Sequence, residues 1–479
     1  MKLIYRVKDK PPFGQTIVFA IQQLLAIMAA TLVVPVIIGN GMQPAAALFG
    51  AGCGTLVYLL FTKFKSPVFL GSSFAFIGSM FAAFGGAVSA AAGYAGIIIG
   101  AIFAGLVYVI IALLVKFVGV GWLNKLMPAV VIGPTVAIIG LSLAGNAIGD
   151  MQTGEVVKTI PNFTVDSATG VVTEGTLQVP VASVLLCVLV GVITLIVTTL
   201  ASTYGKKFMK LIPFICGILA GYAVAAVFTV IGNVADIEWM KIINFSYFSN
   251  LLTDGNVTLE TFIRVPQFSF LSAAEGLKQI DGGYLATLAA AYLPVAFVVF
   301  AEHVADHKNI STIIETDLLE DPGLSRTLLG DGVGSMVGAF FGGCPNTTYG
   351  ESVACVAISR NASVVTTLFT AIGAILISFF APFVAFVDSI PPCVMGGVCV
   401  ALYGFIAVSG LKMLQQVDLN KNRNLFTASS ILIAGIGGLT LNLVFGEIAI
   451  TITAIATALI LGIIVNQILS KEKDEEVVE

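Results

Sequence analysis

Charged residues are scarce in this sequence. Asp, Glu, Lys and Arg together make up 10% of the 479 residues, whereas they make up about a quarter of an average soluble domain. Hydrophobic residues reach 57% of the chain. Too few charged residues are present to cover such a chain with a polar surface, so we expect most of it to lie in a lipid bilayer.

Catalytic and metal-binding motifs are also missing. The sequence contains no HExxH, GxSxG or Walker loop and only two histidines. Its seven cysteines show neither CxxC nor mixed Cys/His spacing, and we interpret them as free thiols in packing positions. We therefore expect no enzymatic activity, no cofactor, no metal site and no nucleic-acid partner.

What the chain does contain is a series of apolar segments of the length that crosses hydrocarbon, about 20 helical residues. They predict an all-α polytopic membrane protein with fourteen transmembrane spans. The predicted spans are 15–38, 44–62, 66–82, 90–117, 124–145, 180–200, 211–232, 285–304, 327–344, 346–359, 363–387, 392–410, 424–443 and 447–469. Two polar stretches, 146–179 and 233–284, are expected to form external loops.

The orientation follows from the placement of basic residues. Placing the N-terminus in the cytoplasm leaves only four of the 23 Lys and Arg residues outside, namely Lys158, Lys241, Arg264 and Lys278. The positive-inside rule predicts such an asymmetry. The charged N-terminal segment runs into the first span without a cleavage site, so we expect no removable signal peptide. These features predict a multi-pass protein of the inner (plasma) membrane with both termini in the cytoplasm.

An internal repeat relates the fifth and twelfth predicted spans. Six residues of one recur in the other without a gap: Pro128, Val130, Gly133, Val136, Ala137 and Gly140 match Pro392, Val394, Gly397, Val400, Ala401 and Gly404. Because seven spans per repeat is an odd number, the second copy must cross the membrane in the opposite sense. The pattern thus predicts two inverted seven-span repeats, which are typical of secondary transporters.

The third and tenth predicted spans are short and interrupted by Pro, Gly, Ser and Thr. They contain SPVFLGSSFAF at 66–76 and CPNTTYGES at 344–352. Each is expected to begin as extended backbone and to continue as a half-helix, capped by Ser72 or Ser73 in one and by Thr347 or Thr348 in the other. The two half-helix N-termini would present free N–H groups, which suit the carbonyl oxygens of a ligand.

Ionisable residues inside spans are costly to bury and are candidate functional residues. Glu351 lies inside the tenth predicted span, and Glu302 closes the eighth, with Asp306 one helical turn later. For Glu302 and Asp306 the alternative is a solvated cytoplasmic helix end, which is how we interpret the neighbouring His303 and His307.

Four motifs resemble one known family. They are AEHV at 301–304, PNTTYGE at 345–351, GSSFAF at 71–76 and DPGLSR at 321–326. Together they resemble the nucleobase-ascorbate transporter family, in particular its bacterial uracil permeases, and the resemblance covers nearly the whole chain. It implies homodimers, a core domain formed by 15–117 with 285–387, and a gate domain formed by 124–232 with 392–469.

The resemblance also implies a substrate site. Carboxylates at Glu302 and Glu351 would accept hydrogen bonds from a nucleobase, and the backbone N–H groups of Phe74 and Gly350 would donate to its carbonyl oxygens. The side chains of Phe74 and Tyr349 would pack near the ring, and Ser73 would complete the site; from the residues alone, Phe74 and Tyr349 are equally typical of ordinary packing. Uracil offers two N–H donors and two carbonyl acceptors, which fits this set.

Two departures from the family pattern concern how proton movement would be coupled to substrate transport. Such permeases often carry His four residues after the glutamate and a Gln-His pair in the first span, whereas this chain has Asp306, and Gln22 with Gln23. The two glutamines are interpreted either as helix cross-links or as ligand contacts. A proton relay would therefore use Glu302 and Asp306 instead of histidines.

The predicted function is import of a nucleobase, uracil first, by proton symport and alternating access. A xanthine or urate permease of the same family is the nearest alternative, because a purine dione offers similar groups. An anion transporter of the same fold is disfavoured by the two glutamates, and a channel by the lack of a continuous polar lining.

Overall fold

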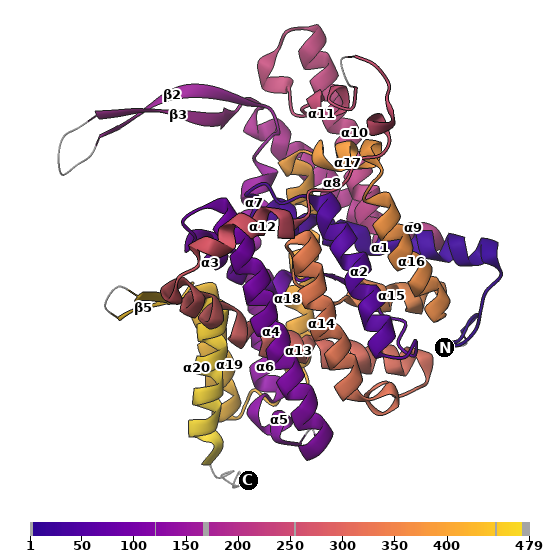
Figure 1. The fold of residues 1–479 in the computed structure, drawn as a ribbon, viewed down its shortest axis with the longest axis vertical. Helices are drawn as coiled ribbons and strands as arrows, with labels where there is room; N and C mark the ends of the chain where they lie inside the picture. The colour runs from indigo at the N-terminus through magenta and orange to yellow at the C-terminus, as the bar shows by residue number, and fades with distance from the viewer. Residues whose placement is uncertain (1–2, 120, 166–171, 253–254, 446–447, 472–479) are drawn as a thin grey trace. The chain divides into compact units, whose positions relative to one another are not determined.

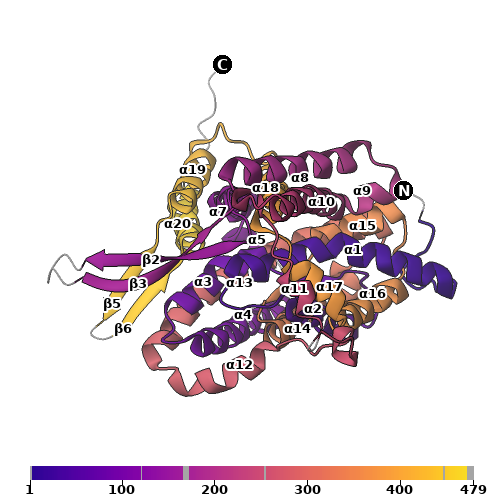
Figure 2. The same ribbon diagram turned by 90° about the horizontal axis from the view of Figure 1, so that it is seen from above.

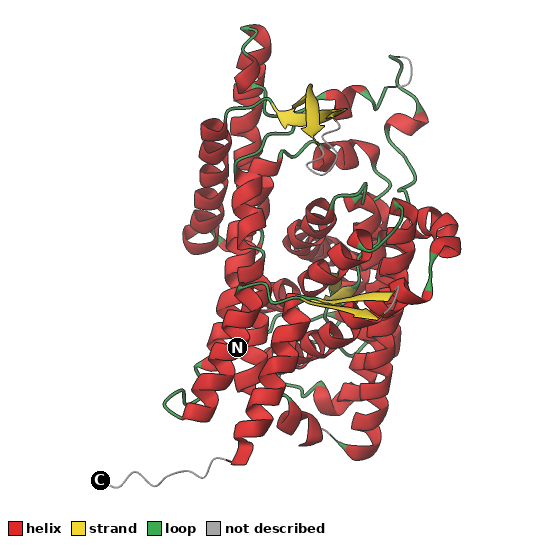
Figure 3. Ribbon diagram, turned by 90° about the vertical axis from the view of Figure 1, so that its left-hand side faces the viewer, coloured by secondary structure: helices red, strands yellow, loops and turns green. Residues whose placement is uncertain are grey.

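The fold is mainly helical. The computed structural model describes residues 3–119, 121–165, 172–252, 255–445 and 448–471. Helices occupy most of these residues, and their strands form three two-stranded antiparallel pairs (Figures 1 and 3). A helix lies at each position where the sequence predicts a span, and eight of the described helices are long and apolar enough to cross a membrane. The fold is thus that of a polytopic membrane protein.

The chain divides into two compact units, and the larger comprises Met1–Leu143, Val265–Phe380 and Leu402–Glu479. Its elements are α1 (Phe13–Ile38), α2 (Pro44–Phe61), β1 (Leu70–Ser72), η1 (Phe74–Phe76), α3 (Ile77–Gly85), α4 (Ala90–Val118), α5 (Gly121–Leu126), α6 (Ala129–Ser142), α12 (Ser269–Gly276), η4 (Leu277–Gln279), α13 (Gly282–Ile314), η5 (Leu319–Gly323), α14 (Leu324–Gly342), β4 (Asn346–Thr348), α15 (Gly350–Ser359), α16 (Val364–Ile377), α19 (Asn422–Ile436), β5 (Leu441–Phe445), β6 (Ile448–Ile452), α20 (Ala454–Ile468) and η6 (Leu469–Lys471).

The smaller unit comprises Ala144–Arg264 and Ala381–Ala401. Its elements are α7 (Ala144–Met151), β2 (Val157–Val165), β3 (Val172–Pro180), α8 (Val184–Tyr204), α9 (Lys207–Leu211), α10 (Pro213–Val234), η2 (Glu238–Met240), α11 (Ser246–Ser249), η3 (Leu259–Thr261) and α17 (Ala381–Asp388). Helix α18 (Pro392–Leu414) begins in this unit and ends in the larger one.

Two predicted spans are divided in the structure. The fifth, 124–145, is split into α5, α6 and α7, and the first break falls at Pro128, which precedes α6 with extended backbone. Proline has no N–H to continue a helix and favours extended backbone in the residue before it. The eleventh, 363–387, is split into α16 and α17, and α17 restarts with Pro382 in its first turn, where proline is tolerated.

The predicted bounds of the last two spans were too long. Helix α19 ends at Ile436, just before Gly438 with its positive φ of 72°. The chain then forms β5 and β6, which pair from Leu441 with Ile452 to Phe445 with Ile448, before α20 begins (Figure 2). The strands are rich in β-branched residues, which favour extended backbone. Residues 446–447 of the predicted fourteenth span lie outside the described part.

The segments related by the sequence repeat contact each other. A Cβ atom built on Gly133 of α6 would lie 2.9 Å from the carbonyl oxygen of Gly410 in α18, and one built on Gly140 would clash with the carbonyl oxygen of Tyr403. Small residues let helix backbones approach this closely, as they do at helix interfaces in membranes. Glycine is therefore required where α6 crosses the C-terminal half of α18.

Glycines also bring α2 and α14 together. The two helices lie side by side (Figure 1). A Cβ atom built on Gly50 would lie 2.6 Å from the carbonyl oxygen of Gly338, and one on Gly54 would lie 2.7 Å from that of Gly334. Since these neighbours are backbone atoms, no side-chain rotation can relieve the overlap.

We predict that Gly50→Ala lowers the stability of the protein by about 1–3 kcal/mol, the usual cost of overpacking. The matched control is Gly14→Ala in α1, because a Cβ atom there meets no atom within 4 Å. Thermal unfolding in detergent measures both. An unchanged transition for Gly50→Ala would show that α2 and α14 can move apart at little cost.

The smaller unit contains a partly buried acid outside the predicted spans. The described parts of the predicted external loop 146–179 include β2 and β3, which form a hairpin. Next to it, Glu155 accepts a hydrogen bond of 2.9 Å from the Tyr247 hydroxyl. Burial raises the pKa of the Glu155 carboxyl, and the Tyr247 hydrogen bond opposes the rise. Asp388 is close enough to interact with Glu155 electrostatically.

A raised pKa means that the folded state binds the Glu155 proton more tightly than the unfolded chain does. The contribution of this proton to stability is therefore complete at low pH and is lost as pH rises through the folded pKa. We predict that Glu155→Gln, which keeps an acceptor for Tyr247, flattens the fall in unfolding temperature on going from acidic to neutral pH. A variant with the full wild-type pH dependence would contradict this assignment.

Candidate functional site

Two extended segments form the centre of the candidate site. Strands β1 and β4 pair antiparallel, with Leu70 opposite Thr348 and Ser72 opposite Asn346. Each strand leads into a helix, β1 into η1 and α3, and β4 into α15. The sequence predicted this order of extended backbone and half-helix at both places, and the structure adds that the two extended stretches pair with each other.

The predicted helix caps were wrong. Ser73 precedes η1 and Tyr349 precedes α15, and neither side chain caps the following helix. The hydroxyl of Thr348 instead donates to the Asp306 carboxylate at 2.8 Å. Strand pairing fixes both segments before the helices begin, so side-chain caps are not needed to hold them.

Tyr349 holds the paired strands in place. Its hydroxyl donates to the carbonyl oxygen of Ser72 at 2.7 Å, and its side chain is 4% exposed. A Cβ atom on Gly71 would clash with the Tyr349 ring. The Ser73 N–H donates to the carbonyl oxygen of Pro345 at 2.9 Å. The tyrosine ring thus packs on the strand itself, and only a glycine in β1 leaves room for it.

Two backbone donors remain at the ends of this pair. Within the described residues, neither the Phe74 N–H nor the Gly350 N–H donates to another protein group. Both residues stand at a helix start, where backbone N–H groups lack intrahelical partners. Gly350 is exposed and Phe74 is partly exposed. Both N–H groups are therefore open to a further acceptor, and their contact with a ligand stays a prediction.

Three carboxylates lie near the Gly350 end of this strand pair. Glu302 and Asp306 lie one turn apart on α13, and Glu351 is the second residue of α15. Glu302 and Glu351 are partly exposed, whereas Asp306 is 8% exposed. A Cβ atom on Gly350 would meet only the Asp306 Oδ1 atom, at 3.9 Å. Open space beside Gly350 is thus bordered by a carboxylate.

The remaining predicted site residues have these positions. The Phe74 ring meets the Tyr403 ring edge-on, with ring centroids 6.0 Å apart. Ser73 is fully buried. Gln23 cross-links helices, because its amide donates to Ser352 Oγ at 3.1 Å and accepts from Thr370 Oγ1 at 3.1 Å. Gln23 therefore has the helix-linking role that was one of its two interpretations.

Sequence reasoning missed a second polar cluster on α13. His303 and His307 are fully buried, so their interpretation as a solvated helix end was wrong. They lie inside α13, which continues past them to Ile314. Asp331 on α14, also fully buried, was not recognised as a candidate, and its Oδ2 atom lies 2.7 Å from His303 Nδ1. Its ionisable side chain inside the ninth predicted span, 327–344, was a usable signal.

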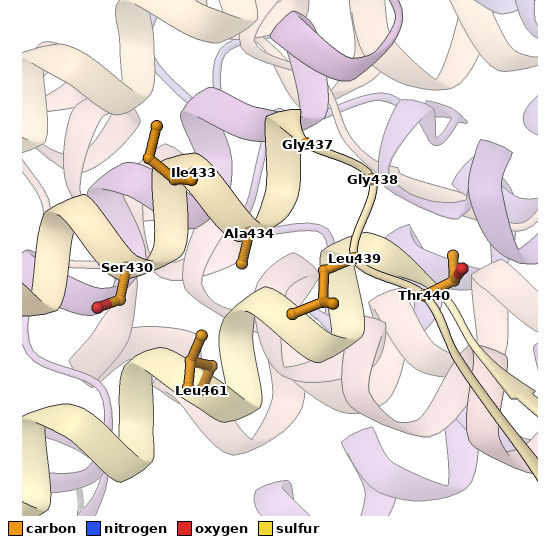
Figure 4. A pocket seen from close by; sticks show the side chains of 8 residues that line it. All are labelled: Ser430, Ile433, Ala434, Gly437, Gly438, Leu439, Thr440 and Leu461. Atoms are coloured by element: carbon orange, nitrogen blue, oxygen red, sulfur yellow. The ribbon is translucent and has the colours of Figure 1, made fainter.

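A separate pocket lies away from these residues. It has a volume of about 570 Å³, lies near the facing ends of α19 and α20, and is lined by Ser430, Ile433, Ala434, Gly437, Gly438, Leu439, Thr440 and Leu461 (Figure 4). None of these side chains is ionisable. Among the described residues, no three His, Cys, Asp or Glu side chains are grouped to hold a metal ion. The carboxylates and free donors beside β1 and β4 remain the candidate site.

A polytopic helical fold with a polar site at two interrupted spans defines a membrane transport protein. The chain belongs to the xanthine/uracil permease family, whose model, described as "Permease family", matches residues 14–444. The uracil permease of Bacillus subtilis is 34% identical over 477 residues, covering 98% of this chain and 96% of that protein. The uracil permease of Escherichia coli K12 is 34% identical over 475 residues, with coverage of 98% and 96%.

Solved structures support the same fold. The murine anion transporter Solute Carrier 26 family member A9, in its inward-facing state, matches with a TM-score of 0.60. The match covers 97% of this chain and 69% of that one at 11% sequence identity. At such low identity the likeness shows the fold alone.

We predict that Gly71→Ala destabilises the protein by about 1–3 kcal/mol, because the added methyl group displaces the buried Tyr349 ring. Gly350→Ala is the matched control, since its methyl group meets only Asp306 Oδ1 at van der Waals distance. Thermal unfolding in detergent compares the two. Equal unfolding temperatures would mean that the Tyr349 ring does not hold the strand pair.

Proposed function

We propose that this protein imports uracil together with a proton. The observation that carries the proposal is the arrangement of two free N–H donors, at Phe74 and Gly350, with the carboxylates of Glu302 and Glu351. Curated relatives about one third identical over nearly their full length are uracil permeases, which supports the same substrate here.

The chemistry of uracil matches this arrangement. Its two carbonyl oxygens need donors, which the backbone N–H groups supply, and its two N–H groups need acceptors, which the carboxylates supply. Backbone donors are fixed by the fold and need no side-chain ordering on binding. Phe74 offers an aromatic face or edge for the ring. Ser73 and Tyr349 support the site from the buried side.

The co-transported cation is a proton in this proposal. Uracil is neutral at physiological pH, so a membrane potential concentrates it only when a charged species travels with it. Glu302 and Asp306 interact electrostatically with each other, and carboxylates placed this close together do not all ionise at once. The Glu302 and Asp306 pair is therefore a candidate proton carrier.

The wider architecture belongs to the same proposal. Fourteen spans in two inverted repeats, both termini in the cytoplasm, a core domain of 15–117 with 285–387 and a gate domain of 124–232 with 392–469 would allow alternating access. Pairing of the third and tenth spans through β1 and β4, and crossing of the fifth and twelfth through α6 and α18, support the repeat. The working form would be a homodimer.

Two rival substrates have less support. A xanthine or urate permease would use the same donors and acceptors, but the relatives quoted above are uracil permeases. An anion is carried by the structural neighbour of the same fold. Here an anion would meet the carboxylates of Glu302, Asp306 and Glu351, which repel it unless they are protonated.

We predict that cells without their own permease take up radiolabelled uracil when they express this protein, and that excess unlabelled xanthine does not compete. Glu351→Gln should lower uptake by about tenfold or more, because losing a charged hydrogen bond to a buried ligand costs about 1.5–3 kcal/mol. Membrane abundance is measured for each variant by immunoblot.

Glu320→Gln serves as the control, because Glu320 is exposed and lies in η5, outside the site. It should take up uracil like the wild type. Competition by xanthine would redirect the assignment to a purine substrate. Wild-type uptake by Glu351→Gln at equal abundance would remove Glu351 from the site.

A further inference from the structure

A chain of buried polar side chains runs beside the candidate site. His303 contacts Asp331 of α14 through Nδ1, at 2.7 Å, and Thr327 through Nε2, at 3.0 Å. The ring of His307 stacks on that of His303, with centroids 4.0 Å apart. His307 in turn meets the Tyr58 hydroxyl at 2.6 Å. All five side chains are fully buried.

The hydrogen bonds define where protons sit on His303. The Thr327 hydroxyl is within 3.0 Å of the Leu324 carbonyl oxygen, which accepts its proton, so Thr327 accepts from His303 Nε2–H. The short contact between His303 Nδ1 and Asp331 Oδ2 then contains one proton. The pair is either an imidazolium with a carboxylate or an imidazole with a carboxylic acid. In both forms the pair has no net charge.

Removing that proton leaves a negative charge that nothing nearby balances. The other Asp331 oxygen, Oδ1, has no hydrogen-bond partner among the described residues. Among the residues that the structure describes, no ion pair joins a Lys or Arg to Asp331, Glu302, Asp306 or Glu351. A buried carboxylate without a partner is costly, so the neutral pair is the stable resting form.

The groups that face Asp331 come from three helices. Glu302 and Asp306 on α13 interact with it electrostatically, and so do the hydroxyls of Tyr108 on α4 and Tyr58 on α2. Glu351 on α15 interacts with Glu302 and Asp306. Apart from the histidines His303 and His307, these groups are acids or phenols. The protonation of the Asp331 and His303 pair is thus linked to the charge of the substrate carboxylates.

We propose that the Asp331 and His303 pair, in place of the Glu302 and Asp306 pair considered above, holds the co-transported proton, as a positioning element that acts on the substrate through Glu302. This inference rests on the proposed function. One proton from the outer solution adds to the anionic pair and makes it neutral, and the same proton leaves to the inner solution after the site has reoriented. No covalent bond other than those to this proton is made or broken.

The link to substrate binding is electrostatic. Glu302 is the residue before His303, and it must be ionised to accept N–H bonds from uracil well. A neutral Asp331 and His303 pair removes one like charge from its surroundings and so favours ionised Glu302. Uracil therefore binds more tightly to the proton-loaded form, and by linkage the proton binds more tightly when uracil is present.

The test uses purified protein in liposomes and compares Asp331→Asn with the wild type. The Asn amide can donate to His303 Nδ1, which fixes the pair in its neutral form. We expect uracil binding and uracil counterflow to persist and the affinity to lose its pH dependence. Uptake driven by an imposed pH gradient should fall from about tenfold accumulation per pH unit to no accumulation.

Asp331→Ser is the second variant, for the case that Asp331→Asn does not fold. Its hydroxyl can donate to His303 Nδ1 but holds no titrating proton, so accumulation should again be lost while counterflow persists. Ser335→Ala is the matched control, one turn further along α14 at another buried side chain. It should accumulate uracil like the wild type.

Proton-driven accumulation by either folded variant would overturn the proposal. Loss of binding and counterflow together with accumulation, in folded protein, would also overturn it and leave the pair a structural role. Wild-type protein that neither binds nor exchanges uracil would contradict the proposed function instead. Wild-type accumulation driven by sodium and indifferent to the pH gradient would refute both proton assignments.

Discussion

The structure depends on how non-helical backbone is satisfied in an apolar surrounding. Unpaired N–H and C=O groups cost several kcal/mol in hydrocarbon, so extended backbone is tolerated only where it finds partners within the protein. Strands β1 and β4 meet that requirement for each other. The last N–H groups bonded across the pair are those of Ser73 and Tyr349, which donate to the carbonyl oxygens of Pro345 and Phe69. The next N–H groups along the chain, those of Phe74 and Gly350, are left for another acceptor. The strand pair that stabilises the two interrupted spans thus also leaves backbone donors open for a ligand.

Close helix packing keeps this strand pair in position. Asn346, the first residue of β4, donates from its amide to the Gly50 carbonyl oxygen at 3.1 Å, next to the point where Gly50 and Gly338 bring α2 and α14 into backbone contact. The Thr55 hydroxyl of α2 accepts from the Leu70 N–H at 2.9 Å. Side-chain bonds from neighbouring helices therefore replace the further strands that a larger sheet would supply.

Much of this arrangement could be predicted from sequence. Hydropathy located a helix at every predicted span, and Pro, Gly, Ser and Thr marked the interruptions that became β1 and β4. Their pairing could not be predicted, since it joins residues far apart in the chain. The β5 and β6 hairpin was missed because its apolar, β-branched residues have the hydropathy of a membrane helix. His303 was assigned to a solvated helix end because the eighth span was predicted to end at 304. The helix continues beyond that point, and the burial of His303 depends on contacts with α14 that the sequence does not reveal.

The site differs from that expected of an anion carrier although the fold is shared. Free N–H groups at two helix starts would suit an anion by themselves. In this chain the carboxylates of Glu302, Asp306 and Glu351 lie near the Gly350 donor, and Asp331 interacts electrostatically with Glu302 and Asp306. Without a nearby Lys or Arg partner in the described part of the chain, these carboxylates would repel a bound anion. A site with backbone donors and carboxylate acceptors suits a neutral ligand that both donates and accepts hydrogen bonds.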